Sequence, residues 1–304
     1  MSESGAEEDA RSAATQVSSL DQWIKRLGLI PDEARQFEVD PNRAKLEFGI
    51  DVNLAQALIA QGLPYKVSDG DPCFTVTDLH YIGLRLGCAK TYLGVLQTWA
   101  SSLRASADGE WTSVEVRCAP YSPQGTAVDV LVGPDQRIRT SVGANRVATS
   151  ILVVPTGQWP VFGSAAEELL ADAASLDFCW IPESLNGDVE FTRRTRLSDC
   201  RNAALLLSME CARLGIVSRM AYGLLLATPF STPHRWVEIR VDDRWVPADP
   251  LLIALLTEHA ALDGSVWPSI RSPGAILLRL AERETAIVLT DGRPLQASFL
   301  TRIL

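Results

Sequence analysis

Residues 197–215 have the sequence LSDCRNAALLLSMECARLG, which is the most informative segment of the chain for its fold. Its pattern predicts a helix in which Ser198 or Asp199 is the N-cap, apolar residues supply the buried face and Gly215 ends the last turn. Cys200 then lies in the first turn. The unpaired N–H groups and the positive end of the helix dipole stabilise a thiolate there, which makes the sulfur a candidate nucleophile at neutral pH.

Three strand patterns follow this helix, at 218–226, 234–241 and 244–250. The two-residue turn Asp242-Asp243 joins the last two, which predicts an antiparallel hairpin. We place His234 at the start of one strand and Asp249 near the end of the other, so both lie at the same end of the hairpin. A cysteine, a histidine and a carboxylate in this order are the parts of an activated thiol, in which the histidine takes the proton and the carboxylate fixes its tautomer.

The stretch from Cys200 to Pro250 resembles the core of the transglutaminase-like superfamily. Four elements carry the resemblance: Asp-Cys at a helix start, an "LGI…R…G" segment (Leu214-Gly215-Ile216, Arg219, Gly223), an "HxWVE" strand and a "WxxxDP" strand. The sequence departs from the usual pattern at Ser198, where glycine usually precedes Asp-Cys, and at Arg235, where a small residue usually follows the histidine. The resemblance implies an α+β, papain-like fold with an antiparallel sheet and a Cys200, His234, Asp249 triad.

Composition limits the class of partner. The 304 residues include 28 Lys+Arg and 37 Asp+Glu, a formal charge of −9, and 47% are apolar. This acidic balance argues against nucleic-acid or anionic-membrane partners, because both repel negative surfaces. Apolar runs such as 251–256 fall far short of the roughly 18 residues of a membrane span, and the acidic segment 1–16 does not resemble a secretory signal. We therefore expect a cytoplasmic protein.

The cysteines and histidines give no sign of a metal site or a disulfide framework. Six cysteines are spread along the chain without a CxxC pair, and three histidines are far apart, so we expect reduced thiols, no metal and no cofactor. These residues are Cys73, Cys88, Cys118, Cys179, Cys200 and Cys211, and His80, His234 and His259. Cys211 lies three turns after Cys200 in an apolar helix, which indicates inert packing.

The spacing of apolar residues along the sequence divides the chain into four regions. We predict a mobile tail at 1–19, a helical N-terminal region at 20–105, a β-rich segment at 106–155 and the transglutaminase-like catalytic domain at 156–304. In the helical region Thr77 is the expected cap of a long helix that reaches Trp99. Three glycines inside that helix, Gly83, Gly87 and Gly94, predict a break or a close helix contact.

Other residues are weaker candidates for the site. Gln158 and Trp159 precede the nucleophile by about forty residues, where family members often supply an oxyanion donor, although the backbone N–H of Cys200 can also serve. Trp236 is a candidate pocket wall, with core packing as the alternative. A basic cluster just before the nucleophile is either a solvated loop or a landing patch for an acidic or phosphorylated partner: Arg193, Arg194 and Arg196.

The resemblance implies attack on an amide, ester or thioester carbonyl and an acyl-Cys200 intermediate. Within the superfamily the plan of the chain is similar to cysteine-dependent Dieckmann cyclases, which release polyketide–peptide chains from carrier proteins as tetramic acids or pyridones. An apolar pocket for the acyl chain and a basic patch for an acyl- or peptidyl-carrier protein fit this expectation. An amide-forming acyltransferase, a cysteine peptidase or amidase, and a non-catalytic binding module are the alternatives.

Overall fold

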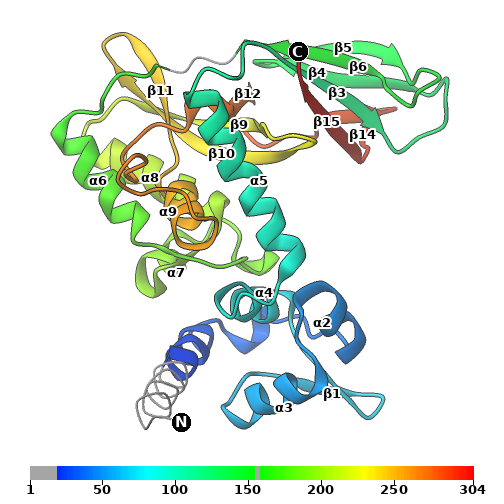
Figure 1. Cartoon of the computed structure of the whole chain (residues 1–304), viewed down its shortest axis with the longest axis vertical. Helices are drawn as coiled ribbons and strands as arrows, with labels where there is room; N and C mark the ends of the chain where they lie inside the picture. Colours follow the sequence, from blue (N-terminus) through cyan, green and yellow to red (C-terminus); the bar gives the residue numbers. More distant parts are fainter. Residues whose placement is uncertain (1–18, 155–157) are drawn as a thin grey trace, which may run out of the picture. The chain divides into compact units, whose positions relative to one another are not determined.

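The computed structural model describes residues 19–154 and 158–304, which form two compact units (Figure 1). The first unit contains the chain up to Leu93 together with Phe178–Leu197, and the second contains Gly94–Asp177 and Ser198–Leu304. The predicted boundary at residue 105 falls inside the second unit. Residues 1–18 of the predicted tail and residues 155–157 at the other predicted boundary lie outside the described part of the chain.

The first unit is mainly helical, as the sequence predicts. Its core joins residues far apart in the sequence, with Leu27, Leu58 and Phe74 packed in one cluster with Phe191 and Leu197. The chain is helical at 19–27, and the further elements are η1 (Asp32–Ala34), α2 (Pro41–Phe48), α3 (Val52–Ala60), β1 (Lys66–Ser68), β2 (Asp71–Cys73), α4 (Val76–Arg85), η2 (Glu183–Leu185) and α7 (Val189–Thr195). α5 (Lys90–Ala107) begins in this unit and continues into the second.

The prediction that Thr77 caps one long helix is wrong. Thr75 is the N-cap of α4, because its backbone is extended and its hydroxyl accepts the N–H of Asp78 at 2.9 Å, whereas Thr77 is buried within the helix. The predicted break occurs at Gly87, whose φ of +68° ends α4 before α5 begins. The predicted close contact occurs at Gly83, where a Cβ atom would lie 2.9 Å from the carbonyl oxygen of Phe48.

The second unit contains two antiparallel sheets. One sheet has the order β12-β9-β10-β15-β3-β6, with β11 paired to β10, and the other has the order β14-β13-β4-β5. The segment at 106–155, predicted to be β-rich, contains β3 to β6. The strands are β3 (Val114–Pro120), β4 (Ala127–Gly133), β5 (Gln136–Ser141), β6 (Thr149–Val153), β9 (Ser218–Leu225), β10 (Phe230–Val241), β11 (Arg244–Ala248), β12 (Leu277–Ala281), β13 (Val288–Thr290), β14 (Arg293–Pro294) and β15 (Ala297–Ile303).

Three helices of the second unit gather beside the β9–β10 part of the sheet (Figure 1). They are α6 (Ser164–Ala174), α8 (Cys200–Arg213) and α9 (Pro250–His259). Leu207 of α8 packs in one buried cluster with Val237 of β10 and Val246 of β11. This packing holds the start of α8 beside the hairpin, and the predicted mixed α+β architecture is confirmed.

The remaining short elements complete the chain. The two-residue strands β7 (Asp177–Phe178) and β8 (Leu197–Ser198) lie where the chain passes between the units, and η3 (Gly274–Ile276) precedes β12. Among the residues that the structure describes, no helix is long and apolar enough to cross a membrane. All six cysteines lie in the part of the chain that the structure describes, and no disulfide bond joins any two of them.

Candidate active site

Helix α8 begins at Cys200, and Asp199 is its N-cap. The Asp199 carboxylate accepts the N–H of Asn202 at 2.9 Å and interacts with the N–H of Arg201, while burial raises the pKa of this carboxyl group. At its other end the helix stops before Gly215, which has a φ of +70°. Cys200 is half-buried at the first helical position, where the N–H groups have no partner within the helix. The predicted helix is therefore confirmed, with the sulfur and an available N–H group at its positive end.

Strands β10 and β11 form the predicted hairpin. Val241 pairs with Arg244, and the intervening Asp242 and Asp243 have φ angles of +45° and +62°, as a two-residue hairpin turn requires. The prediction that His234 starts its strand is wrong, because β10 already begins at Phe230. The first residues of β10 pair with β15, a strand some seventy residues later, and this pairing leaves no local pattern in the sequence.

His234 and Asp249 form a buried hydrogen-bonded pair. The distance between His234 Nε2 and Asp249 Oδ2 is 2.5 Å, and the two residues are 8% and 7% exposed. The second carboxylate oxygen of Asp249 accepts the N–H of Leu252 at 3.0 Å and so caps α9. A carboxylate fixed by a helix cap holds the imidazole in one orientation, which is the role that such a partner has in acyl-transfer sites.

Cys200 and Asp249 both act on the His234 ring. Burial lowers the pKa of His234, but the attraction of Asp249 and Cys200 and a side-chain hydrogen bond to each of them outweigh burial and raise this pKa to about 10. The imidazole is therefore protonated at neutral pH. Because His234 Nε2 is hydrogen-bonded to Asp249, Nδ1 is the ring nitrogen that can interact with the Cys200 sulfur. The sulfur, the imidazole and the carboxylate therefore lie in the order that an activated thiol requires.

The other residues of the sequence motif build the sheet around His234. Glu238 is buried and forms an ion pair with Arg219, its neighbour on β9, and Arg219 stacks on Trp245 at 4.2 Å. Gly223 pairs with His234 across β9 and β10, and a Cβ atom at Gly223 would lie 1.9 Å from the carbonyl oxygen of Leu278 on β12. The glycine is required because β12 approaches the backbone closely at this point.

Comparison with known families agrees with this geometry. The family model of the transglutaminase-like superfamily matches residues 181–250, which contain all three members of the candidate triad. Residues 181–250 are therefore similar in sequence to the core of this superfamily. The match supports an enzyme of the cysteine-based acyl-transfer or peptidase class with Cys-His-Asp chemistry. Comparison of the chain with curated proteins gives no match.

Two of the weaker candidates line a pocket near this transglutaminase-like core. Gln158 and Trp159 belong to the wall of a cavity of about 600 Å³, and Cys200 is not among the lining residues. Trp159 packs against Gly274, and its indole nitrogen is buried without a hydrogen-bond partner in the described residues. Ser272, also in the wall, donates to the carbonyl oxygen of Pro247 at 2.6 Å, two residues before Asp249. The pocket therefore adjoins β11, which ends one residue before the candidate carboxylate of Asp249.

Trp236 and Cys211 are core residues of the second unit. Trp236 is 1% exposed, and its ring lies at 16° to the His234 ring with 6.3 Å between the two centroids, so core packing is the interpretation that agrees with the structure. Cys211 is fully buried, and burial raises the pKa of its thiol. The interpretation of Cys211 as packing agrees with this environment.

The basic cluster before Cys200 belongs to α7 and the residue after it. Arg193 and Arg194 are exposed, and Arg193 forms an ion pair with Glu190 one turn earlier. Arg196 follows the helix with a φ of +61°. All three residues lie in the first unit, whereas Cys200 lies in the second.

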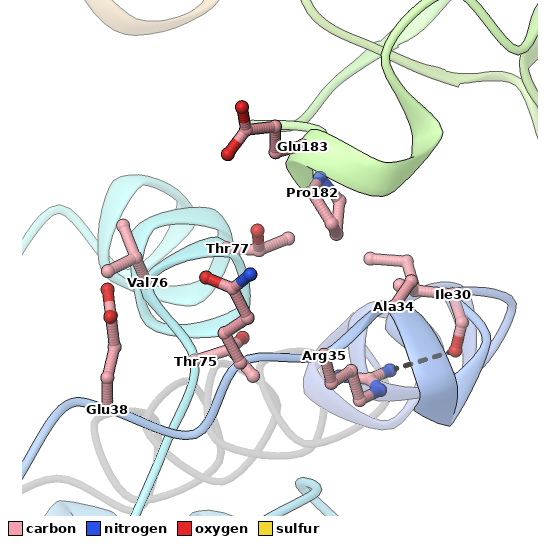
Figure 2. A pocket seen from close by; sticks show the side chains of 10 residues that line it. Ile30, Ala34, Arg35, Glu38, Thr75, Val76, Thr77, Pro182 and Glu183 are labelled. Atoms are coloured by element: carbon pink, nitrogen blue, oxygen red, sulfur yellow. Dashed lines mark hydrogen bonds between the residues drawn. The ribbon is translucent and has the colours of Figure 1, made fainter.

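A second hollow lies in the first unit (Figure 2). It has a volume of about 70 Å³, and its wall includes Arg35, Thr77 and Glu183. This volume is well below the roughly 300–1,000 Å³ of most small-molecule sites. In residues 19–154 and 158–304 no group of three or more His, Cys, Asp or Glu side chains could hold a metal ion.

Sequence reasoning missed Arg201, Tyr222 and Glu284 around the nucleophile, and it noted Arg235 without giving it a role in the site. Arg201 and Arg235 both form ion pairs with Glu284, and Cys200 acts electrostatically on Tyr222, which pairs with Arg235 across the sheet. The unusual arginine after the histidine was the available signal. Glu284 lies 83 residues after Arg201, in a charged segment that has no local feature of a site.

Proposed function

We propose that the protein is a Dieckmann-type cyclase that releases a β-ketoacyl-aminoacyl chain from a carrier-protein thioester as a tetramic acid or pyridone. The observation that carries this proposal is the buried His234, held between Asp249 and Cys200 with a pKa raised to about 10. This arrangement supplies an acid for the leaving thiol first and a base for carbon afterwards. The match to the transglutaminase-like superfamily supports the first step, the transfer of the acyl group to Cys200.

The first half of the reaction transfers the acyl group to the enzyme. The Cys200 thiolate attacks the thioester carbonyl and forms a bond from sulfur to carbon, while the N–H of Cys200 at the helix start stabilises the oxyanion. The bond to the carrier sulfur breaks, and the leaving thiolate takes the proton of the His234 imidazolium. The products are acyl-Cys200, a free carrier thiol and a neutral imidazole.

The second half closes the ring. Neutral His234 removes a proton from the carbon between the two carbonyls of the β-ketoacyl group, and the resulting carbanion attacks the acyl-Cys200 carbonyl. A carbon–carbon bond forms, the bond to Cys200 breaks, and the thiolate and imidazolium are restored without uptake of water. Intramolecular attack has a large effective-concentration advantage over water when the chain is held in a closed apolar pocket.

The cavity beside β11 is large enough for a β-ketoacyl-aminoacyl chain. Its volume of about 600 Å³ lies within the range of small-molecule sites, and two tryptophans, two prolines and other apolar residues form much of its wall. The apolar and aromatic members of this wall are Trp159, Pro160, Val161, Val266, Trp267, Pro268 and Ile270. Trp159 would place its unpartnered indole N–H near an acyl carbonyl, and Gln158 lies beside it as a second polar group.

The reaction is tested by the mass of the product. Synthetic N-β-ketoacyl-aminoacyl thioesters are incubated with the protein and with the Cys200→Ala variant, and products are measured by mass spectrometry. We expect the cyclic product from the first sample alone. The free acid, heavier by one water, as the sole enzyme-dependent product would replace the cyclase with a hydrolase. An amide formed with an added amine would favour the amide-forming acyltransferase.

The proposed partner is an acyl- or peptidyl-carrier protein, and the exposed arginines of the α7 cluster are its proposed contact. Charge reversal at Arg193, Arg194 and Arg196 should weaken turnover of a carrier-bound thioester and leave a small thioester mimic unaffected, since only the carrier presents an acidic surface. Equal losses on both substrates would contradict this contact.

A further inference from the structure

Two arginines beside Cys200 share one carboxylate. Arg201 Nη2 lies 3.3 Å from Oε1 of Glu284, and Arg235 forms an ion pair with Oε2 of the same residue. Arg201 directly follows Cys200 on α8, and Arg235 directly follows His234 on β10. The cluster is therefore attached to the same two elements that hold the nucleophile and the imidazole.

Two acids face the two arginines of the cluster, Glu284 through ion pairs and Asp199 through electrostatic attraction. The Arg235 side chain is 9% exposed, and burial together with repulsion by Arg201 lowers its pKa. Nε of Arg201 is buried and has no hydrogen-bond partner among the described residues. Asp199, the other acid nearby, caps α8. A buried cation and an unused donor are features of a site that accepts an anion.

Glu284 is the member of the cluster that can be replaced. It follows β12 outside any strand, and its side chain is 49% exposed, whereas Arg235 is anchored in β10 with its side chain almost fully buried. Tyr222, paired with Arg235 in the sheet, lies 5.9 Å from the guanidinium, measured to the ring centroid, and provides an aromatic wall. Arg235 is thus the fixed member of the site, whereas the Arg201 side chain is partly exposed.

We infer that Arg201 and Arg235 bind a carboxylate of the substrate next to Cys200, in the place that Glu284 occupies in this structure. The planar guanidinium fork matches a carboxylate, and the structure shows one seated there. The inference rests on the proposed role of Cys200 as the nucleophile. It assigns the substrate class to thioesters that carry a free carboxylate close to the reacting carbonyl.

Alkylation of Cys200 tests the site without any acyl transfer. Iodoacetate and iodoacetamide react identically, by forming a bond from the sulfur to the methylene carbon as iodide leaves, but only iodoacetate carries a carboxylate. We expect the iodoacetate-to-iodoacetamide rate ratio at Cys200 to fall about tenfold in Arg235→Gln and Arg201→Gln. Glu284→Gln should raise the ratio, because it removes the competing carboxylate.

Arg302→Gln is the matched control, since Arg302 forms a similar exposed pair with Glu115 between β15 and β3. This variant should keep the ratio of the unchanged protein. An unaltered ratio in Arg201→Gln and Glu284→Gln would overturn the inference even if Arg235→Gln failed to fold. A ratio that changed equally in Arg302→Gln would also overturn it, because the effect would then reflect net charge alone.

A pair of substrates separates this inference from the proposed function. Thioesters that differ only by a terminal carboxylate or a carboxamide are compared by kcat/KM in the unchanged protein and in Arg235→Lys. The carboxylate substrate should be preferred about tenfold, and the preference should shrink in the variant. If neither thioester is turned over, the proposed function fails while the alkylation ratio still decides the carboxylate site.

Discussion

The two units each contain a buried ion pair, and only one of the pairs faces a nucleophile. In the first unit Arg35 and Asp78 are almost fully buried, and the Arg35 guanidinium also donates to the carbonyl oxygen of Leu27 at 2.6 Å. In the second unit His234 and Asp249 are similarly buried, but the imidazole has Cys200 on its other side. Burial and pairing alone therefore do not mark an active site.

The balance of electrostatic effects differs between the two pairs. Burial raises the pKa of Asp78 by more than the neighbouring Arg35 lowers it, so burial decides the outcome. At His234 burial lowers the pKa, and Asp249 and Cys200 together reverse that effect. Arg35 also has a third charged neighbour, Asp32 at 3.3 Å, so the nucleophilic side chain of Cys200 is what distinguishes the His234–Asp249 pair.

The largest expected effect is the loss of acyl transfer when members of the Cys200, His234, Asp249 triad in the second unit are replaced. Cys200→Ala and His234→Ala should reduce acyl transfer by about 1,000-fold or more, because they remove the nucleophile and its acid–base partner. Asp249→Asn should leave a residual rate above both, since a misoriented imidazole still acts. Steady-state kinetics on folded variants checks the order. Near-native turnover in His234→Ala would remove this residue from the mechanism.

The second effect concerns the stability of the first unit. Arg35→Met leaves the Asp78 carboxyl group buried without its cation, so the free energy of unfolding should fall by about 3–5 kcal/mol. Urea unfolding measures the change. The double variant Arg35→Met, Asp78→Asn should recover part of the loss. A loss below about 1 kcal/mol in the single variant would show that the pair is not needed for stability.

A third effect concerns the close approach of strands opposite His234. Gly223→Ala should cost about 1–3 kcal/mol, because the added Cβ would meet the Leu278 carbonyl oxygen at 1.9 Å. Gly94→Ala on α5 is the control, since no atom lies within 4 Å of its added Cβ and alanine favours a helix. Thermal unfolding should show a lower Tm for the first variant and an equal or higher one for the second.

The smallest effect, when it is expressed per pH unit, is the change in unfolding free energy that the titration of His234 contributes. Its folded pKa of about 10 lies above the usual 6.5, so its stabilisation is complete below pH 6.5 and is lost as the pH rises through 10. The slope for one proton is at most about 1.4 kcal/mol per pH unit. The difference in unfolding free energy between the protein and His234→Gln should shrink over this window. A constant difference would contradict the raised pKa.

Local sequence predicted the elements whose hydrogen bonds join near neighbours. The cap at Asp199 and the turn at Asp242-Asp243 depend on residues within a few positions, and both occur as expected. The cap at Thr75 depends on a longer-range contact, because the extended backbone there follows the bridge of Phe74 to Val39, and the local pattern that predicts Thr77 does not show this bridge.

The extent of β10 and the division into units could not be read from the local pattern. β10 starts early because β15 pairs with it, and the segment 178–197 returns to the first unit because Phe191 and Leu197 complete a core begun at Leu27. Both outcomes depend on apolar surfaces far apart in the sequence. Periodicity reports which face of an element is buried but does not report its partner.

Local sequence was enough to predict the Cys-His-Asp order and the helix that begins at Cys200. It also predicted the hairpin that brings His234 and Asp249 to the same end of two paired strands. Only the tertiary structure decided that Arg201 and Arg235 meet at Glu284 and that β12 closes against Gly223. The physical reason is range. Caps and tight turns are fixed by backbone hydrogen bonds between near neighbours, whereas pairing across 83 residues requires the sheet to be assembled first.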